Sequence, residues 1–170
     1  MQTLIKPERF HTIPGPLVLA AGFFDGVHRG HRSVLDDAVS RARGLGGTAW
    51  ALTFDQHPLS ILDPARRPPL LTPMQSRLLR LAESGMDGCL MLPFTRELAS
   101  LPPGAFVELL CGGKRAIAEI RCGDNWRFGA GGTGTPALLA QLGRQHGFEV
   151  VVVPAVSYKG LPISSTRIRQ

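Results

Sequence analysis

Cysteine is scarce in this 170-residue sequence, and long apolar runs are absent. The three cysteines are odd in number and form no Cys-x-x-Cys pair, which excludes a disulfide scaffold and a zinc ribbon. No stretch has the roughly 18 uninterrupted apolar residues that a membrane span needs, and the N-terminus carries charges where a secretory signal needs an apolar run. We therefore expect a soluble, cytoplasmic protein that makes no use of a membrane.

Acidic residues are fewer than basic ones, 13 against 19, which gives a net charge of +6. This balance is compatible with a nucleic acid, an acidic membrane surface or a polyphosphate as partner. The basic residues are scattered, and most fit the solvated faces of helices, so charge alone selects no partner. With 44% hydrophobic residues and no repeat or linker, the sequence predicts one domain over residues 1–170.

Short apolar runs alternate along the sequence with segments of helical periodicity. Residues 17–21 and 49–54 are almost entirely apolar, as in strands buried on both faces of a sheet. Between them, apolar residues recur at three- and four-residue steps and stop at Gly44, which predicts a β-α-β unit. The alternation continues with strands over 88–92, 116–120 and 148–153 and with helices after Thr72 as N-cap, over 105–110 and over 137–146. This order predicts an open, doubly wound parallel α/β sheet.

The turn after the first strand, residues 22–31, contains a His-x-Gly-His sequence that ends at His31. In such sheets ligands bind beyond the carboxyl ends of the strands, and the start of a helix attracts anions. The imidazoles of His28 and His31 add hydrogen-bond donors whose charge responds near neutral pH, which suits phosphate. Two alternatives stay open: unrelated surface histidines, or a zinc site, which lacks further ligands nearby and is less favoured.

A cluster of hydroxyls and guanidinium groups occupies the other end of the chain, over residues 163–169. Ser164, Ser165 and Thr166 precede Arg167 there, and this combination fits the oxygens of a polyphosphate. An ordinary helix cap is the alternative, and it explains one hydroxyl of the cluster.

The glycine-rich stretch 129–134 fits the Gly-x-Gly-x-x-Gly pattern of dinucleotide-binding turns. That fingerprint belongs directly after a strand and is followed by an acidic residue about 20 positions on. Here residues 124–128 intervene after the strand, and Glu149 follows the end of the stretch by only 15 positions. We interpret the stretch as a flexible loop and expect no nicotinamide cofactor.

Four segments of the sequence occur together in the order typical of one enzyme family: 22–31, 53–58, 123–129 and 163–169. In these segments, and over about residues 17–169, the sequence resembles the FMN adenylyltransferase module of bacterial bifunctional riboflavin kinase/FAD synthetases. The resemblance implies a Rossmann-like fold of the nucleotidyltransferase type. It also implies transfer of an adenylyl group from ATP to FMN, with Mg²⁺, giving FAD and pyrophosphate. The implied partners are these small molecules and not a nucleic acid.

The resemblance also implies roles for individual residues. The expected catalytic residues are His28, His31 and Arg167. The expected ATP-binding residues are Gly22, Phe23, Phe24, Asp25, Gly26, Gly30, Ser164, Ser165 and Thr166. The expected FMN-binding residues are His57, Asn125 and Phe128. Metal ligands are not assigned, and Asp25 either organises the turn or lies next to the metal's ligands.

The sequence departs from the family at several points. Gln56 replaces a usual proline, Phe23 a common asparagine, and residues 129–134 lack the usual basic side chains. No riboflavin kinase module is expected within residues 1–170, so the chain is either a stand-alone enzyme or part of a bifunctional one. Two other functions stay open: a related nucleotidyltransferase with another phosphorylated acceptor, and a non-catalytic nucleotide-binding module.

Overall fold

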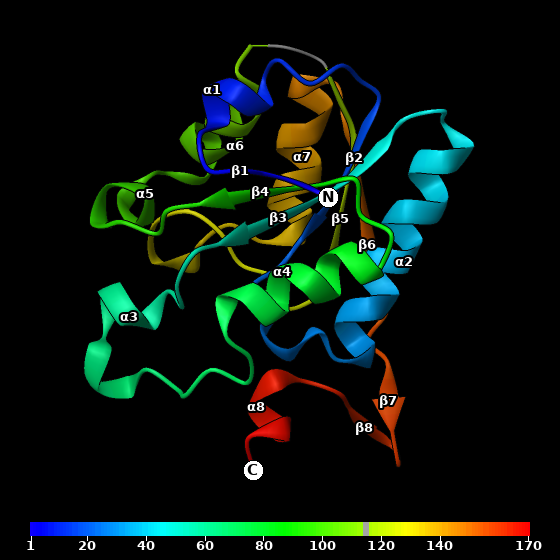
Figure 1. Ribbon diagram of the computed structural model, residues 1–170. Coiled ribbons are helices and arrows are strands. Elements are labelled where there is room, and N and C mark those ends of the chain that lie inside the picture. The colour runs from blue at the N-terminus through cyan, green and yellow to red at the C-terminus, as the bar shows by residue number, and fades with distance from the viewer. Residues whose placement is uncertain (114–115) are drawn as a thin grey trace.

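The protein, seen here as a computed structural model that describes residues 1–113 and 116–170, is built on a parallel sheet of six strands (Figure 1). The strand order is β1-β4-β3-β2-β5-β6, and every neighbouring pair is parallel. The strands are β1 (Gln2–Leu4), β2 (Leu17–Ala21), β3 (Thr48–Phe54), β4 (Gly88–Leu92), β5 (Ile117–Gly123) and β6 (Glu149–Val153). The doubly wound parallel sheet predicted from the sequence is confirmed.

Helices cover both faces of the sheet (Figure 1). The helices of the described chain are α1 (Pro7–Phe10), α2 (Arg29–Gly44), α3 (Leu59–Leu62), α4 (Met74–Glu83), α5 (Arg96–Ser100), α6 (Pro103–Cys111), α7 (Pro136–His146) and α8 (Ser165–Ile168), of which α3 and α8 lie away from the sheet. A short antiparallel hairpin, β7 (Ser157–Tyr158) and β8 (Leu161–Pro162), precedes α8. Within the described ranges, no helix has the length and apolar character needed to cross a membrane.

The strands are apolar because each face packs against its own hydrophobic core. Leu17 and Leu19 of β2 pack in one core with residues of α1, α6 and α7, whereas Val18 and Ala20 pack in the other with α2 and α4. Side chains of a strand point alternately to its two faces, so a strand between two helical layers needs apolar residues at every position. All five residues of β2 are buried, which places the carboxyl end of this strand at the centre of the molecule.

The order of the strands reverses at β2. From β2 the chain adds β3 and β4 on one side, and it then returns to add β5 and β6 on the other. At such a reversal the loops that follow the two central strands diverge and leave a crevice. The fold therefore predicts a ligand site beyond the carboxyl ends of β2 and β5.

Several local features differ from the sequence-based expectation or were missed by it. Thr72 is not the N-cap of the following helix, because α4 begins at Met74 after Pro73, and the Thr72 hydroxyl accepts a hydrogen bond from the amide of Gly26 instead. The edge strand β1 was not predicted, since three residues are too few to show a period. The hairpin β7–β8 is equally short and was also missed.

Candidate functional site

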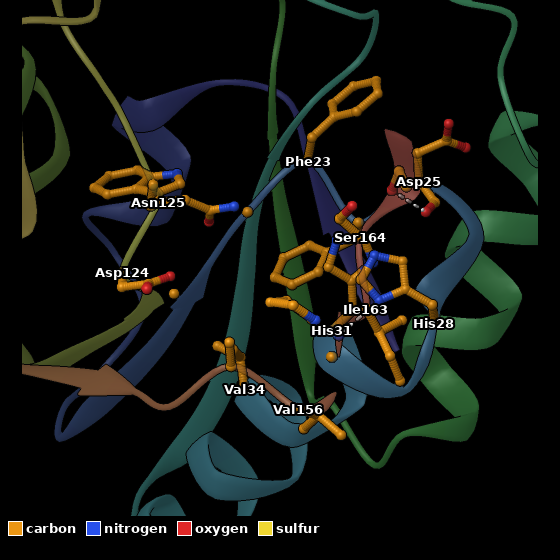
Figure 2. Close-up of a pocket in the computed structure, with 18 of the residues that line it drawn as sticks. Phe23, Asp25, His28, His31, Val34, Asp124, Asn125, Val156, Ile163 and Ser164 are labelled. Atoms are coloured by element: carbon orange, nitrogen blue, oxygen red, sulfur yellow. Dashed lines mark hydrogen bonds between the residues drawn. The ribbon is translucent and has the colours of Figure 1, made fainter. Parts of the chain in front are cut away.

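A cavity of about 530 Å³ opens beyond the carboxyl ends of the strands. Its walls come from the loops after β2, β3, β5 and β6 and from the C-terminal segment that includes α8. Figure 2 shows His28, His31 and Ser164 on one side of the cavity and Asn125 on the other. The two phosphate-binding segments predicted from opposite ends of the sequence therefore meet at one site.

These two segments are in direct contact. A Cβ atom on Gly30 would lie 3.2 Å from the backbone oxygen of Ile163, which is tighter than an ordinary contact. The hydroxyl of Ser165 donates a hydrogen bond of 3.1 Å to the backbone oxygen of Asp25. Glycine at position 30 thus lets the start of α2 and the C-terminal segment approach closely enough to share a ligand.

The turn after β2 is held in an uncommon backbone conformation. Phe24 and Val27 have positive φ values of 56° and 40°, a region that side chains with a Cβ rarely adopt. Gly26 has φ 80°, and a Cβ there would lie 2.9 Å from Cδ1 of Leu71. This conformation costs free energy that contacts around the turn must offset.

His28 ends this turn as the N-cap of α2. Its Nδ1 atom accepts a hydrogen bond of 3.2 Å from the backbone amide of His31. An accepting Nδ1 carries no proton, so the neutral ring has its proton on Nε2. The cap therefore fixes the tautomer and leaves Nε2–H of His28 as a donor for a ligand in the cavity.

The rings of His28 and His31 stack with their centroids 3.6 Å apart and an interplanar angle of 16°. Burial lowers the pKa of His28 below its usual value, although Asp25 opposes the shift. Burial, and then the neighbouring His28 ring, lowers the pKa of His31 to about 3. The sequence suggests titration near neutral pH, but the folded chain holds both rings neutral there, as hydrogen-bond donors without charge.

This burial makes the stability of the protein depend on pH. The pKa of His31 is about 3 in the folded chain against an ordinary 6.5, so the unfolded chain binds more protons between these values. The contribution to stability is complete above pH 6.5 and is lost as the pH falls toward 3. We expect the free energy of unfolding of the wild type to fall by about 1–2 kcal/mol more than that of a His31→Gln variant between pH 7 and pH 5.

Urea denaturation at several pH values measures this difference. His28 and His57 also have lowered pKa values, but they are present in both proteins, so the comparison isolates His31. Parallel pH profiles for the two proteins contradict the neutral, buried state of His31.

Asp25 joins the turn to two distant segments. Its carboxylate is 2% exposed and accepts hydrogen bonds from the backbone amides of Leu71, at 2.9 and 3.0 Å, and Thr72, at 3.1 Å. Nη2 of Arg169, near the end of the chain, donates to the same carboxylate at 2.5 Å. Of the two roles left open by the sequence, these contacts favour organisation of the turn.

The two arginines of the C-terminal segment point to different places. The guanidinium of Arg167 donates to the backbone oxygens of Tyr158 and Leu161, at 3.3 and 3.0 Å, and does not line the main cavity. Arg169 does line it. The family resemblance implies a role for Arg167, which lies outside this cavity. Arg169 follows Ser165 by four residues, so the two share one helix face, and both line the cavity.

The remaining residues predicted for ATP are gathered at the cavity. Gly26 shapes the turn without lining the cavity. The others all line it: Gly22, Phe23, Phe24, Asp25, Gly30, Ser164, Ser165 and Thr166. Ser164 also caps α8, since its hydroxyl accepts a hydrogen bond of 3.3 Å from the amide of Arg167. The capping alternative thus accounts for the hydroxyl of Ser164 and leaves those of Ser165 and Thr166 unexplained.

The loops after β5 and β3, which flank β2 on its two sides, also line the cavity. Asn125 and His57 line the cavity, and His57 accepts a hydrogen bond on Nδ1 from the amide of Leu59, which leaves Nε2–H as a donor. Phe128 does not line the cavity: it is 4% exposed and stacks behind Trp126, with ring centroids 4.9 Å apart. Trp126 supplies an aromatic surface in the loop after β5. Its position next to Asn125 in the sequence is the feature that could have predicted it as a lining residue.

An open parallel sheet with a cavity at its strand reversal, lined by imidazoles, hydroxyls and a guanidinium, defines a Rossmann-like α/β protein with a site suited to phosphorylated ligands. Comparison with known families makes the assignment specific. The FAD synthetase family model matches residues 11–167, and the chain belongs to this family.

Individual relatives agree with the family. The bifunctional riboflavin kinase/FMN adenylyltransferase of Escherichia coli (strain K12) is 35% identical over 153 residues, which cover 90% of this chain and 49% of the relative. A Geobacillus thermodenitrificans relative named for the same two activities is 39% identical over 161 residues, covering 94% of this chain and 83% of its own length. The chain thus spans about half the length of the E. coli relative.

A solved structure resembles the whole described fold. The crystal structure of a macrolide-efflux protein from Streptococcus pneumoniae matches 98% of this chain and 55% of that chain, with a TM-score of 0.78. Its sequence is 24% identical, so this likeness shows the fold alone.

Proposed function

We propose that the chain transfers an adenylyl group from ATP to FMN and releases FAD and pyrophosphate. The observation that carries this proposal is one cavity that brings the imidazoles, hydroxyls and guanidinium of residues 22–31 and 163–169 together with the Asn125 amide, the His57 imidazole and the Trp126 indole. Membership of the FAD synthetase family and the names of the relatives support the choice of substrates.

The proposed reaction depends on the positioning of the two substrates more than on a general base. An oxygen of the FMN phosphate bonds to the α-phosphorus of ATP, and the bond from that phosphorus to the bridging oxygen of the β-phosphate breaks. Pyrophosphate leaves with the electron pair. The attacking phosphate is already an anion at neutral pH, so the protein contributes in-line positioning and neutralisation of charge at the phosphates.

Donor side chains in the cavity supply that neutralisation. In our proposal, His28 and His31 donate from Nε2–H to the phosphates at the reacting centre. The hydroxyl of Thr166 and the guanidinium of Arg169 hold the triphosphate tail, because both residues line the cavity and come from the same C-terminal segment. The role that sequence analysis gave to Arg167 passes to Arg169 in this proposal.

In our proposal, the FMN acceptor binds against the loops after β5 and β3. The flavin ring packs on Trp126, while Asn125 and His57 donate hydrogen bonds to its polar edge or to its phosphate. Phe128 supports Trp126 from the core and does not itself line the cavity. A phosphorylated aromatic acceptor is thus favoured over one with an aliphatic chain.

Magnesium fits this site as part of the nucleotide substrate. Among the described residues there is no group of three or more His, Cys, Asp or Glu side chains that could hold a metal. The oxygens of Asp25 are already engaged by two amides and Arg169. Because Mg²⁺ commonly binds through substrate phosphates with few protein ligands, we propose that it arrives with ATP, and no step is assigned to a protein-held ion.

We also propose a cytoplasmic protein that acts on small molecules. The three cysteines are free and buried, as expected in a reducing compartment. Burial raises the pKa of Cys89 to about 12, so this cysteine stays a thiol.

The alternative function is binding of nucleic acid through the basic face. That function requires an affinity for nucleic acid that falls steeply as the salt concentration rises.

The test is to incubate the purified chain with ATP, Mg²⁺ and FMN and to separate the products by chromatography. We expect FAD and pyrophosphate in equal amounts. Nicotinate mononucleotide and phosphopantetheine, offered in place of FMN, are expected to give no adenylylated product. Transfer to either of these acceptors but not to FMN contradicts the proposed substrate. Nucleotide binding without pyrophosphate release identifies a non-catalytic module.

A further inference from the structure

A buried arginine that the proposed reaction does not use lies behind the turn after β2. Arg77, on α4, is 3% exposed. Its Nη1 atom donates to the backbone oxygen of Phe23 at 3.1 Å, and Nη2 donates to that of Phe54 at 2.6 Å. None of the residues that the structure describes forms an ion pair with it. Nη2 also contacts Sδ of Met74 at 3.0 Å, and Nε has no hydrogen-bond partner among the described residues. A buried charge without an ion pair is costly, which points to a function beyond stability.

The two carbonyl groups belong to two neighbouring loops of the site. Phe23 is in the turn after β2, and Phe54 ends β3, directly before the loop that carries His57. A guanidinium presents its donors in a planar fork, so one arginine can fix two acceptors at a set distance and angle. Arg77 therefore joins the turn after β2 to the loop that carries His57.

Aromatic contacts extend this link into the cavity. The guanidinium carbon of Arg77 lies 4.7 Å from the centroid of the Phe23 ring. The edge of the His57 ring meets the Phe23 ring with centroids 5.0 Å apart and an interplanar angle of 84°. Phe23 and His57 line the cavity, and Figure 2 shows the Phe23 ring at its rim.

We propose that Arg77 is a positioning residue that holds Phe23, and through Phe23 the imidazole of His57, in place for the FMN acceptor. This inference rests on the proposed function for the identity of the acceptor. The backbone oxygen of Phe23 also accepts a hydrogen bond of 3.0 Å from the Thr53 hydroxyl, so the carbonyl is fixed from two sides next to the positive φ of Phe24.

The kinetic test compares Arg77→Met and Arg77→Lys with the wild type in FAD formation. We expect Arg77→Met to raise the KM for FMN about tenfold, with a smaller effect on the KM for ATP. Arg77→Lys is expected to recover part of this loss, because an ammonium can bind one carbonyl but not both. In a His57→Ala background, the additional effect of Arg77→Met on the KM for FMN is expected to disappear, since the positioned group is gone.

Arg121→Met is the matched control. Arg121, on β5, is a similarly buried arginine at 7% exposure, but it pairs with Glu119 and Asp37, which do not line the cavity. We expect this variant to lower the midpoint of thermal unfolding without changing the ratio of the two KM values. An equal change in that ratio for Arg121→Met, or additive effects of Arg77→Met and His57→Ala, overturns the proposal.

A second measurement needs no substrate. In nuclear magnetic resonance spectra of the free protein, the ring signals of His57 are expected to shift in Arg77→Met and to stay unchanged in Arg121→Met. Unshifted His57 signals in Arg77→Met overturn the positioning role even if the chain makes FAD. Shifted signals in a chain that makes no FAD support the positioning role and contradict the proposed function alone, so the two failures are distinguishable.

Discussion

Replacing His31 with alanine is expected to lower the turnover number for FAD formation by about 10²–10³-fold, the usual cost of removing one donor to a developing charge. The ring of His31 lines the cavity, and its Nδ1 atom is buried without a hydrogen-bond partner among the described residues. Its remaining nitrogen, Nε2, is the atom left to serve the phosphates. Steady-state kinetics with ATP and FMN measure the effect, and circular dichroism verifies that the variant is folded.

His28 requires a control for its second role, because its side chain also caps α2. His28→Ala is expected to lose turnover to a similar extent and also about 0.5–2 kcal/mol of stability through the lost cap. His28→Asn is expected to restore the stability, since asparagine is a good N-cap, but not the turnover. Recovery of turnover in His28→Asn means that His28 serves only as a cap and contradicts its place in the reaction.

The second large effect is expected at Arg169. Arg169→Met removes a guanidinium from the cavity and the partner of the buried Asp25 carboxylate. We expect kcat/KM for ATP to fall about 100-fold, as for the loss of a charged donor to phosphate. Stability is expected to fall by about 3 kcal/mol, because a buried charge loses its partner. Arg167→Met is the matched control, and its kcat/KM is expected to stay within about threefold of the wild type.

A double variant separates the two losses at Arg169. Asp25→Asn in the Arg169→Met background removes the unpaired charge, while the asparagine oxygen can still accept from the amide of Leu71. We expect this change to recover most of the stability measured by urea denaturation and little of the activity. Recovery of both shows that Arg169 acts only through Asp25. A larger loss in Arg167→Met than in Arg169→Met returns the phosphate role to Arg167.

The fold was predictable because its signals are local. A strand covered on both faces is apolar throughout, so β2 and β4 are visible in the sequence with their observed bounds. The helix after β2 shows its period over several turns and ends at Gly44, as predicted. The parts that were missed are short. The strands β1, β7 and β8 have two or three residues each, and the helices α1, α3 and α5 have four or five.

The candidate site was predictable to the level of segments and not always of side chains. Residues 22–31 and 163–169 were expected at one site, and the structure brings them into contact through Asp25 and Ser165. The choice between Arg167 and Arg169, by contrast, depends on which way a short helix faces. The choice between Phe128 and Trp126 likewise depends on which ring the core covers.

The alternating architecture, the position of the turn after the first central strand and the residue types of the two site segments can be read from the amino-acid sequence. These follow from periodicity and from the chemistry of side chains, which neighbouring residues already carry. Only the tertiary structure decided the electrostatics: the neutral stacked imidazoles, the carboxylate of Asp25 closed by Arg169, and the guanidinium of Arg77 behind Phe23. Burial and partners set the charge of a group, and both come from segments far apart in the chain.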